Sequence, residues 1–283
     1  MNIVNILEEI EKVDGEIYER LNPRRKAMKD FFSMGSKVAM AAMPFAVGSM
    51  FQKAYGQTVP AGVINVLQYA LTLEHFEFTF YYKGYFTAGL VPAKDNRSIL
   101  IICESERFHV EFLQKVIRSL GATPVAAKVS YDFTAGSGSG NGPFKDVFSN
   151  YVTFLAVAQV LEDTGVRAYK GRAAELLGEK VFLTAALGIH AVEARHAAKI
   201  RYMRRINGHA LNLKPWITGA NDSGVPAADG NYVREDNVIQ AGINITTLPG
   251  VGGNISFNAA TEAFDEPLTA AAVLALVAPF GVS

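Results

Sequence analysis

Two short stretches decide how this chain folds: Glu106-Arg107-Phe108-His109 and Glu193-Ala194-Arg195-His196. In each, a glutamate and a histidine are three residues apart, so on an α-helix both side chains lie on one face. An earlier glutamate precedes each stretch, Glu74 before the first and Glu162 before the second. These two lie 88 residues apart, and Glu106 and Glu193 lie 87 apart. The spacing therefore indicates two copies of one helix pair.

Hydrophobic periodicity around these stretches predicts four long helices, at about residues 60–84, 95–119, 145–176 and 179–206. All four are longer than the average helix of a globular protein, which favours a helical bundle. The long connection 122–144 joins the second helix to the third and contains a glycine-rich stretch expected to form a flexible tip. We therefore predict an all-α four-helix bundle with one long crossover.

Composition shifts divide the chain into three parts. Residues 1–58 are expected to form an N-terminal helical extension, and residues 59–207 the bundle. Residues 208–283 are rich in glycine, proline, asparagine and aspartate, and are expected to form loops with short strands. A short apolar helix at about 267–279 ends this C-terminal extension.

The repeated glutamates each lie in the middle of an apolar helical stripe, so their side chains are expected to be buried together. A buried carboxylate is unfavourable by several kcal/mol unless it is paired or coordinated. Four converging carboxylates repel one another, and two divalent cations would remove that repulsion.

Carboxylate and imidazole ligands suit iron, manganese and zinc better than calcium. The expected metal ligands are four glutamates and two histidines: Glu74, Glu106, His109, Glu162, Glu193 and His196. Glu77 competes with Glu74 for the first position, but only Glu74 has the spacing to Tyr81 that Glu162 has to Tyr169. These two tyrosines are expected either to hydrogen-bond ligand carboxylates or to supply an electron, or else to be core residues.

Composition excludes several other classes of protein. The chain has 283 residues, 27 basic and 27 acidic side chains, and 49% hydrophobic residues. This composition argues against intrinsic disorder, and the balanced charge argues against nucleic acid as the main partner. The single cysteine, Cys103, excludes an intrachain disulfide framework and a cysteine-rich zinc site. No apolar run is long enough for a transmembrane helix.

The order of the two glutamates and two Glu-x-x-His stretches resembles that of the ferritin-like superfamily, which includes ferritins, bacterioferritins, rubrerythrins and manganese catalases. Residues 67–75, 131–133, 189–196 and 263–268 resemble the desiccation-related group of ferritin-like domain proteins in particular. The resemblance implies a ferritin-like bundle with two iron or manganese ions. It also implies a reaction with dioxygen or peroxide, as in ferroxidases, peroxidases or catalases.

Three questions stay open at this stage. The alternative to a redox centre is a non-enzymatic structural or stress-protective protein, in which a metal only stabilises the bundle. The apolar segments 38–51 and 268–280 are expected to mediate homo-oligomer contacts. Residues 24–29 resemble a twin-arginine export signal, which leaves the periplasm open beside the cytoplasm. That stretch has an atypical alanine at position 27, and many acidic residues precede it.

Overall fold

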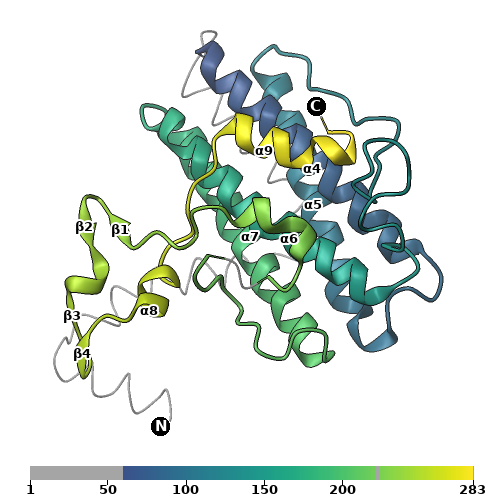
Figure 1. Cartoon of the computed structure of the whole chain (residues 1–283). Helices are drawn as coiled ribbons and strands as arrows, with labels where there is room; N and C mark the ends of the chain where they lie inside the picture. The colour runs from purple at the N-terminus through teal and green to yellow at the C-terminus, as the bar shows by residue number, and fades with distance from the viewer. Residues whose placement is uncertain (1–59, 221–222, 283) are drawn as a thin grey trace, which may run out of the picture. The chain divides into compact units, whose positions relative to one another are not determined.

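The computed structural model describes residues 60–220 and 223–282, all of which belong to the unit spanning residues 54–283. The predicted N-terminal extension 1–58, with its twin-arginine stretch and the apolar segment 38–51, lies outside the described residues. Four long helices follow one another in the chain: α4 (Ala61–Phe86), α5 (Ala93–Ser119), α6 (Tyr151–Ala173) and α7 (Lys180–Ile206). Figure 1 shows them running side by side, which confirms the predicted all-α bundle.

Local sequence sets the helix boundaries. Pro92 precedes α5 at the N-cap position, where its missing N–H is harmless. Gly121 follows the helix with a φ of +78°, a left-handed conformation that glycine adopts without strain. The third helix begins at Tyr151 and not near residue 145, because the side chain of Asn150 caps it by accepting from the Val152 N–H at 3.0 Å.

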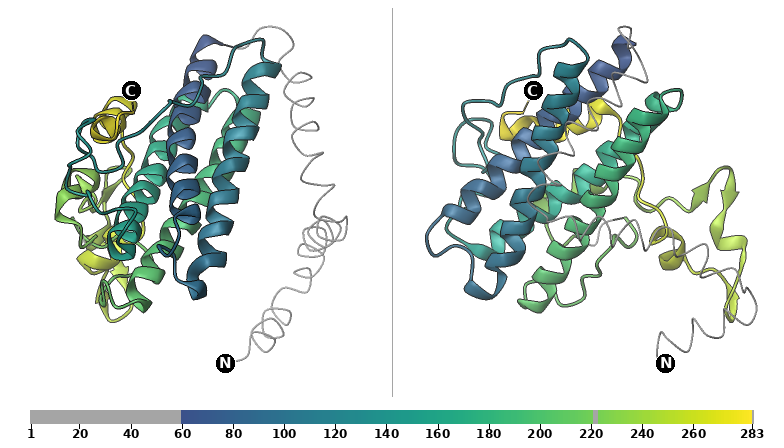
Figure 2. Two further views of the ribbon diagram at one scale, coloured as in Figure 1. Left: turned by 90° about the vertical axis from the view of Figure 1, so that its right-hand side faces the viewer. Right: turned by 180° about the vertical axis from the view of Figure 1, so that it is seen from behind.

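The four helices form two pairs, as the sequence repeat predicts. Short connections join α4 to α5 and α6 to α7, and the members of each pair are in extensive contact, so each pair is an antiparallel hairpin. Residues 120–150 form the long crossover between the pairs. Both views in Figure 2 show the four helices alongside one another. All four helices can therefore contribute side chains to one interior.

Aromatic side chains tie the crossover and the C-terminal residues to the bundle core. Phe76 on α4 stacks on Phe133 of the crossover, with ring centroids 5.4 Å apart, and contacts Phe280 at the same distance. Phe80 stacks on Phe154 of α6 at 4.9 Å. These rings belong to one buried cluster. The crossover therefore packs against the bundle as part of its core.

The glycine-rich stretch of the crossover, which we expected to be a flexible tip, is hydrogen-bonded around one aspartate. Asp132 accepts from the backbone N–H and hydroxyl of Thr134, and from the N–H groups of Gly138 and Gly140 at 2.8 and 3.1 Å. Its half-buried carboxylate thus supplies the acceptors that the turns would otherwise lack.

The C-terminal extension is made of short elements. In chain order they are η2 (Pro226–Tyr232), β1 (Ile239–Gln240), β2 (Ile243–Asn244), η3 (Ile245–Thr247), β3 (Pro249–Gly250), β4 (Gly253–Asn254), α8 (Phe257–Thr261), α9 (Ala270–Val277) and η4 (Ala278–Phe280). A further short helix, η1 (Ala174–Leu176), lies in the connection between α6 and α7. Strand β1 pairs with β2 and β3 pairs with β4, each pair as a separate antiparallel hairpin. The last α-helix is shorter than the predicted 267–279, because Thr269 caps it by accepting from the Ala272 N–H.

Buried arginines of the bundle hold this extension in place. Arg167 on α6 donates to the carbonyls of Glu266 and Val233 at 2.7 and 2.6 Å, and forms an ion pair with Glu235 at 2.7 Å. On α7, Arg201 donates to the carbonyl of Trp216 in the extension at 3.1 Å, and it forms an ion pair with Asp163 of α6 at 2.7 Å. Since Arg167 is fully buried, the extension satisfies a charge that the bundle alone would leave unpaired.

The apolar segment 268–280, which we expected to mediate oligomer contacts, buries part of its surface within the chain. Val273, Val277 and Phe280 lie in the core cluster, and α9 is in contact with α6. Over the described ranges, no helix combines the length and hydropathy needed to cross a membrane.

Candidate metal centre

Each of the four long helices contributes to one buried cluster of carboxylates and imidazoles. Glu74 comes from α4, Glu106 and His109 from α5, Glu162 from α6, and Glu193 and His196 from α7. All four glutamates are fully buried, and the two histidines are 8% and 6% exposed. The structure thus brings together all six residues that the sequence pattern selects.

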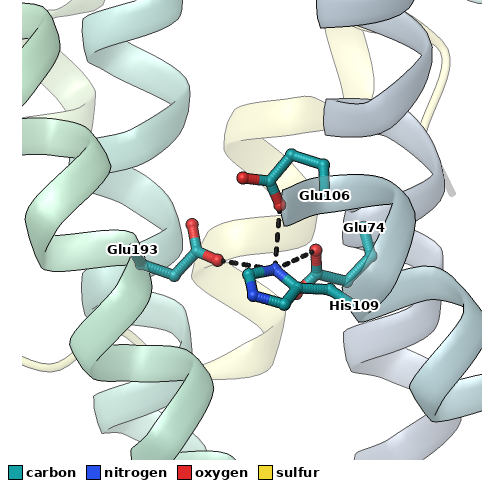
Figure 3. A group of neighbouring side chains, drawn as sticks. All are labelled: Glu74, Glu106, His109 and Glu193. Atoms are coloured by element: carbon teal, nitrogen blue, oxygen red, sulfur yellow. Dashed lines mark hydrogen bonds and ion pairs between the residues drawn. The ribbon is translucent and has the colours of Figure 1, made fainter. Parts of the chain in front are cut away.

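The first group centres on one ring nitrogen. His109 Nδ1 lies 3.1 Å from Glu74 Oε2, 2.9 Å from Glu106 Oε2 and 3.2 Å from Glu193 Oε1. Figure 3 shows the three carboxylates pointing at this nitrogen from three helices. A neutral imidazole nitrogen carries at most one proton, so it cannot donate to all three oxygens.

The second group repeats this arrangement around His196. Its Nδ1 lies 2.7 Å from Glu106 Oε1 and 3.4 Å from Glu162 Oε2, and Glu193 completes the group. Within each group, one potential ligand atom from every residue lies within 4.8 Å of the others. Glu106 and Glu193 belong to both groups. They therefore occupy the positions of carboxylates that could bridge two ions.

Several of these atoms lack the hydrogen bonds that burial demands. In the described part of the chain, five buried atoms make no well-aligned hydrogen bond, although four of them lie 2.7–3.4 Å from an opposing nitrogen or oxygen of the cluster: Glu106 Oε1, Glu162 Oε2, both carboxylate oxygens of Glu193, and His196 Nδ1. Buried polar atoms are nearly always satisfied, so this concentration of unpartnered lone pairs requires another partner. Cations would supply that partner.

The spacing of the ligand atoms also fits metal ions. The nitrogen–oxygen distances given above run from 2.7 to 3.4 Å. Adjacent ligands of an octahedral ion at about 2.1 Å lie about 3 Å apart. The donor set and its spacing are therefore compatible with bound metal ions.

Without cations, the cluster holds protons in their place. Burial raises the pKa of Glu74, and raises that of Glu162 to about 8. Burial alone would lower the pKa of His109, but the neighbouring carboxylates outweigh this effect and raise it well above its usual value. The same balance raises the pKa of His196. Cation binding must therefore displace protons from this cluster.

The two repeat-related tyrosines bind across the bundle. Tyr81 on α4 donates to Glu162 Oε1 on α6 at 2.5 Å, and Tyr169 on α6 donates to Glu74 Oε1 on α4. In both carboxylates the other oxygen, Oε2, faces the histidine of its group. Each tyrosine thus fixes one oxygen of a carboxylate and leaves the second directed into the cluster.

Nearby titratable residues have other surroundings. His75 and His190 contact backbone carbonyls, of Val125 at 3.1 Å and of Val166 at 3.0 Å, as ordinary helix histidines do. Burial raises the pKa of Cys103 to about 12, so its thiol stays protonated. Glu77 is also buried, although it belongs to neither group. Of the two rivals on α4, Glu74 is the one in the first group.

Comparison with known proteins agrees with this architecture. The sequence model of the ferritin-like domain matches residues 62–205, which make up just over half of the chain and contain all six cluster residues. No curated protein and no solved structure matches the chain. On this match, together with the four-helix bundle that carries it, the chain belongs to the ferritin-like domain family.

Proposed function

We propose that this chain is a non-haem two-metal protein whose centre reacts with dioxygen or peroxide. The observation that carries the proposal is that Glu106 and Glu193 are common to both buried groups. The ligands would be Glu74, Glu106 and His109 with Glu193 for one ion, and Glu162, His196 and the two shared glutamates for the other. The expected ions are iron or manganese, whose ligand preferences match carboxylate with imidazole.

Charge balance supports two divalent ions. Four ionised glutamates carry four negative charges, and two divalent cations with two neutral imidazoles cancel them. A cluster neutral as a whole can remain buried, whereas the same carboxylates without cations must take up protons. When bound, iron or manganese would supply the one-electron changes that none of these side chains provides.

The chain's own residues would position the ligands. Tyr81 and Tyr169 hold the outer oxygens of Glu162 and Glu74. Such supporting hydrogen bonds orient metal ligands and tune their basicity. The apolar core around the cluster excludes bulk water, which strengthens every electrostatic interaction inside it. We further propose that the two tyrosine phenols, which contact ligand carboxylates directly, can donate an electron to the centre.

The resemblance to the desiccation-related group is a finer proposal. Its support is the sequence similarity in residues 131–133 and 263–268, which fall at two structural junctions. Asp132 organises the turns of the crossover, and the 263–268 segment contacts α6, where the Leu268 N–H donates to the carbonyl of Arg167.

Metal content tests the proposal directly. Protein purified without added metal should contain about two iron or manganese ions per chain. The double variant Glu106→Ala/Glu193→Ala should lose both, because it removes the two shared ligands. The matched control is Glu104→Ala/Glu111→Ala, which removes two exposed carboxylates of α5 and should keep the metal. Wild-type protein that neither contains nor takes up iron or manganese would refute the proposal.

A further inference from the structure

The repeat of the two helix pairs is broken at one position beside the metal centre. An offset of 88 residues relates Glu74 to Glu162 and Tyr81 to Tyr169. By the same offset, the residue that corresponds to Glu77 in the second half of the repeat is Gly165. One half of the repeat thus carries a carboxylate where the other half has no side chain.

Glu77 is a buried carboxylate without a partner of its own. Its side chain is 6% exposed, and no hydrogen bond or ion pair to it is present in residues 60–220 and 223–282. The charged groups that act on it most strongly are Glu193 and Glu106, the two shared carboxylates of the centre. A carboxylate that serves only packing would be placed away from like charges.

Gly165 leaves the space that Glu77 uses. A Cβ atom at position 165 would lie 3.0 Å from Glu193 Oε2 and 3.3 Å from Glu77 Oε1. The two oxygens therefore approach the same point of α6, one from α4 and the other from α7. Glycine is less favourable than alanine inside a helix, so this position needs a reason, and the two carboxylates supply one.

We propose that Glu77 is a fifth carboxylate of the metal centre and that the absence of a side chain at Gly165 leaves the space that Glu77 occupies. The inference rests on the proposed two-metal function and deepens it. With Glu77 the two ion positions differ, because the added negative charge lies beside Glu193 and has no counterpart in the other half of the repeat. The centre then holds cations more tightly than its six-residue set would by itself.

The first test measures binding of Mn²⁺ to metal-stripped full-length protein by titration calorimetry. Glu77→Gln keeps the shape of the side chain and removes its charge. We expect Mn²⁺ affinity to fall by about 10- to 100-fold, as for other groups that support metal sites. The metal-free variant should unfold at about the same temperature as metal-free wild type, because burial raises the pKa of Glu77 well above its usual value and the carboxyl already carries a proton when no cation is bound. A pure packing role predicts unchanged affinity and a lower unfolding temperature.

The second variant, Gly165→Ala, crowds the same two oxygens from α6. Mn²⁺ affinity should fall although alanine favours the helix. Its control is Gly188→Ala on α7, where no atom lies within 4 Å of the added carbon, and which should bind Mn²⁺ like wild type.

The two proposals fail in different ways. Wild-type protein that takes up neither Mn²⁺ nor iron refutes the two-metal function. Wild-type protein that binds two ions, with Glu77→Gln binding them equally well, overturns the role of Glu77 alone.

Discussion

The phenol of Tyr81 on α4 reaches across the bundle to Glu162 on α6, with 2.5 Å between the hydroxyl and Oε1. Tyr169 makes the reverse connection, from α6 back to Glu74 on α4. The two helix pairs are thus cross-linked by hydrogen bonds whose acceptors are candidate metal ligands. Stability of the bundle and affinity for metal should therefore change together.

Tyr81→Phe should lower both quantities. The change leaves a buried carboxylate oxygen without its donor, and such a loss destabilises a protein by about 1.5–3 kcal/mol. Chemical denaturation of the metal-free variant measures the loss in free energy of unfolding, and Mn²⁺ titration measures the loss of metal affinity. Tyr82→Phe is the matched control, because Tyr82 is the next residue and is 52% exposed. Equal effects of the two substitutions would contradict the assignment.

The metal-free protein should lose stability as pH rises. Burial raises the pKa of Glu162 from 4.5 to about 8, so the folded state keeps a proton that the unfolded state releases. This contribution is fully present below about pH 4.5 and is lost as pH rises through about 8. The raised pKa values of His109 and His196 act in the same direction, above the pKa of an unfolded histidine.

Thermal unfolding between pH 5 and pH 9, with and without bound Mn²⁺, measures this effect. The metal-loaded protein has exchanged those protons for cations and should show a flatter profile. Affinity for Mn²⁺ should rise over the same range, because binding releases protons. An unfolding temperature of the metal-free protein that climbs steadily to pH 9 would argue against a buried protonated cluster.

Arg167→Met should destabilise the chain strongly, through the C-terminal extension. The substitution leaves Glu235 buried without its cation, which destabilises a protein by about 3–5 kcal/mol. Adding Glu235→Gln should recover much of the loss, since it removes the unpaired charge. Arg107→Met, at an exposed pair on α5, should change stability by less than about 1 kcal/mol. Denaturant titrations of wild type and the three variants make the comparison.

Gly171→Ala tests the contact between α6 and the segment that leads into α9. A Cβ atom at 171 would lie 1.8 Å from the carbonyl oxygen of Leu268, so one of the two backbones must move. Overpacking of this kind lowers stability by about 1–3 kcal/mol. Limited proteolysis should then cut the C-terminal extension faster than in wild type. Protection equal to that of Gly188→Ala would show that the contact is dispensable.

Turnover distinguishes a redox centre from a structural metal. Protein loaded with iron or manganese should consume hydrogen peroxide, and the Glu106→Ala/Glu193→Ala variant should not. A purely structural metal predicts a raised unfolding temperature on loading and no peroxide consumption. Oxygen-electrode and peroxide assays on the same preparations, beside thermal unfolding, separate these two outcomes.

Much of the fold could be predicted from sequence because its signals are local and repeated. Each Glu-x-x-His stretch places two candidate ligands on one helix face, and the apolar stripe around Glu193 indicates which face is buried. The equal spacing of Glu74 to Tyr81 and of Glu162 to Tyr169 shows that the helix with Glu74 corresponds to the helix with Glu162 in the repeat. These patterns depend on one helix at a time, so they can be read without the tertiary structure.

Other features depend on contacts between distant segments and gave no local signal. Asn150 moves the start of α6 through a cap that competes with helical periodicity. The glycine-rich stretch contains typical loop residues, and the role of Asp132 in ordering it emerges only from the folded turns. Glu77 was considered only as a rival of Glu74, because nothing local connects it to Gly165. The repeat offset of 88 residues was the signal that could have found that pair.

The pairing of the crossover with the last described residues has a consequence during synthesis. The Asp132 N–H donates to the carbonyl of Phe280 at 2.9 Å, and the Ser137 N–H to that of Pro279 at 2.8 Å. The helical hairpins close between near neighbours and can form as the chain leaves the ribosome. The aromatic cluster around Phe76 must wait for residue 280. A nascent chain therefore leaves part of that cluster exposed until residue 280 has been synthesised.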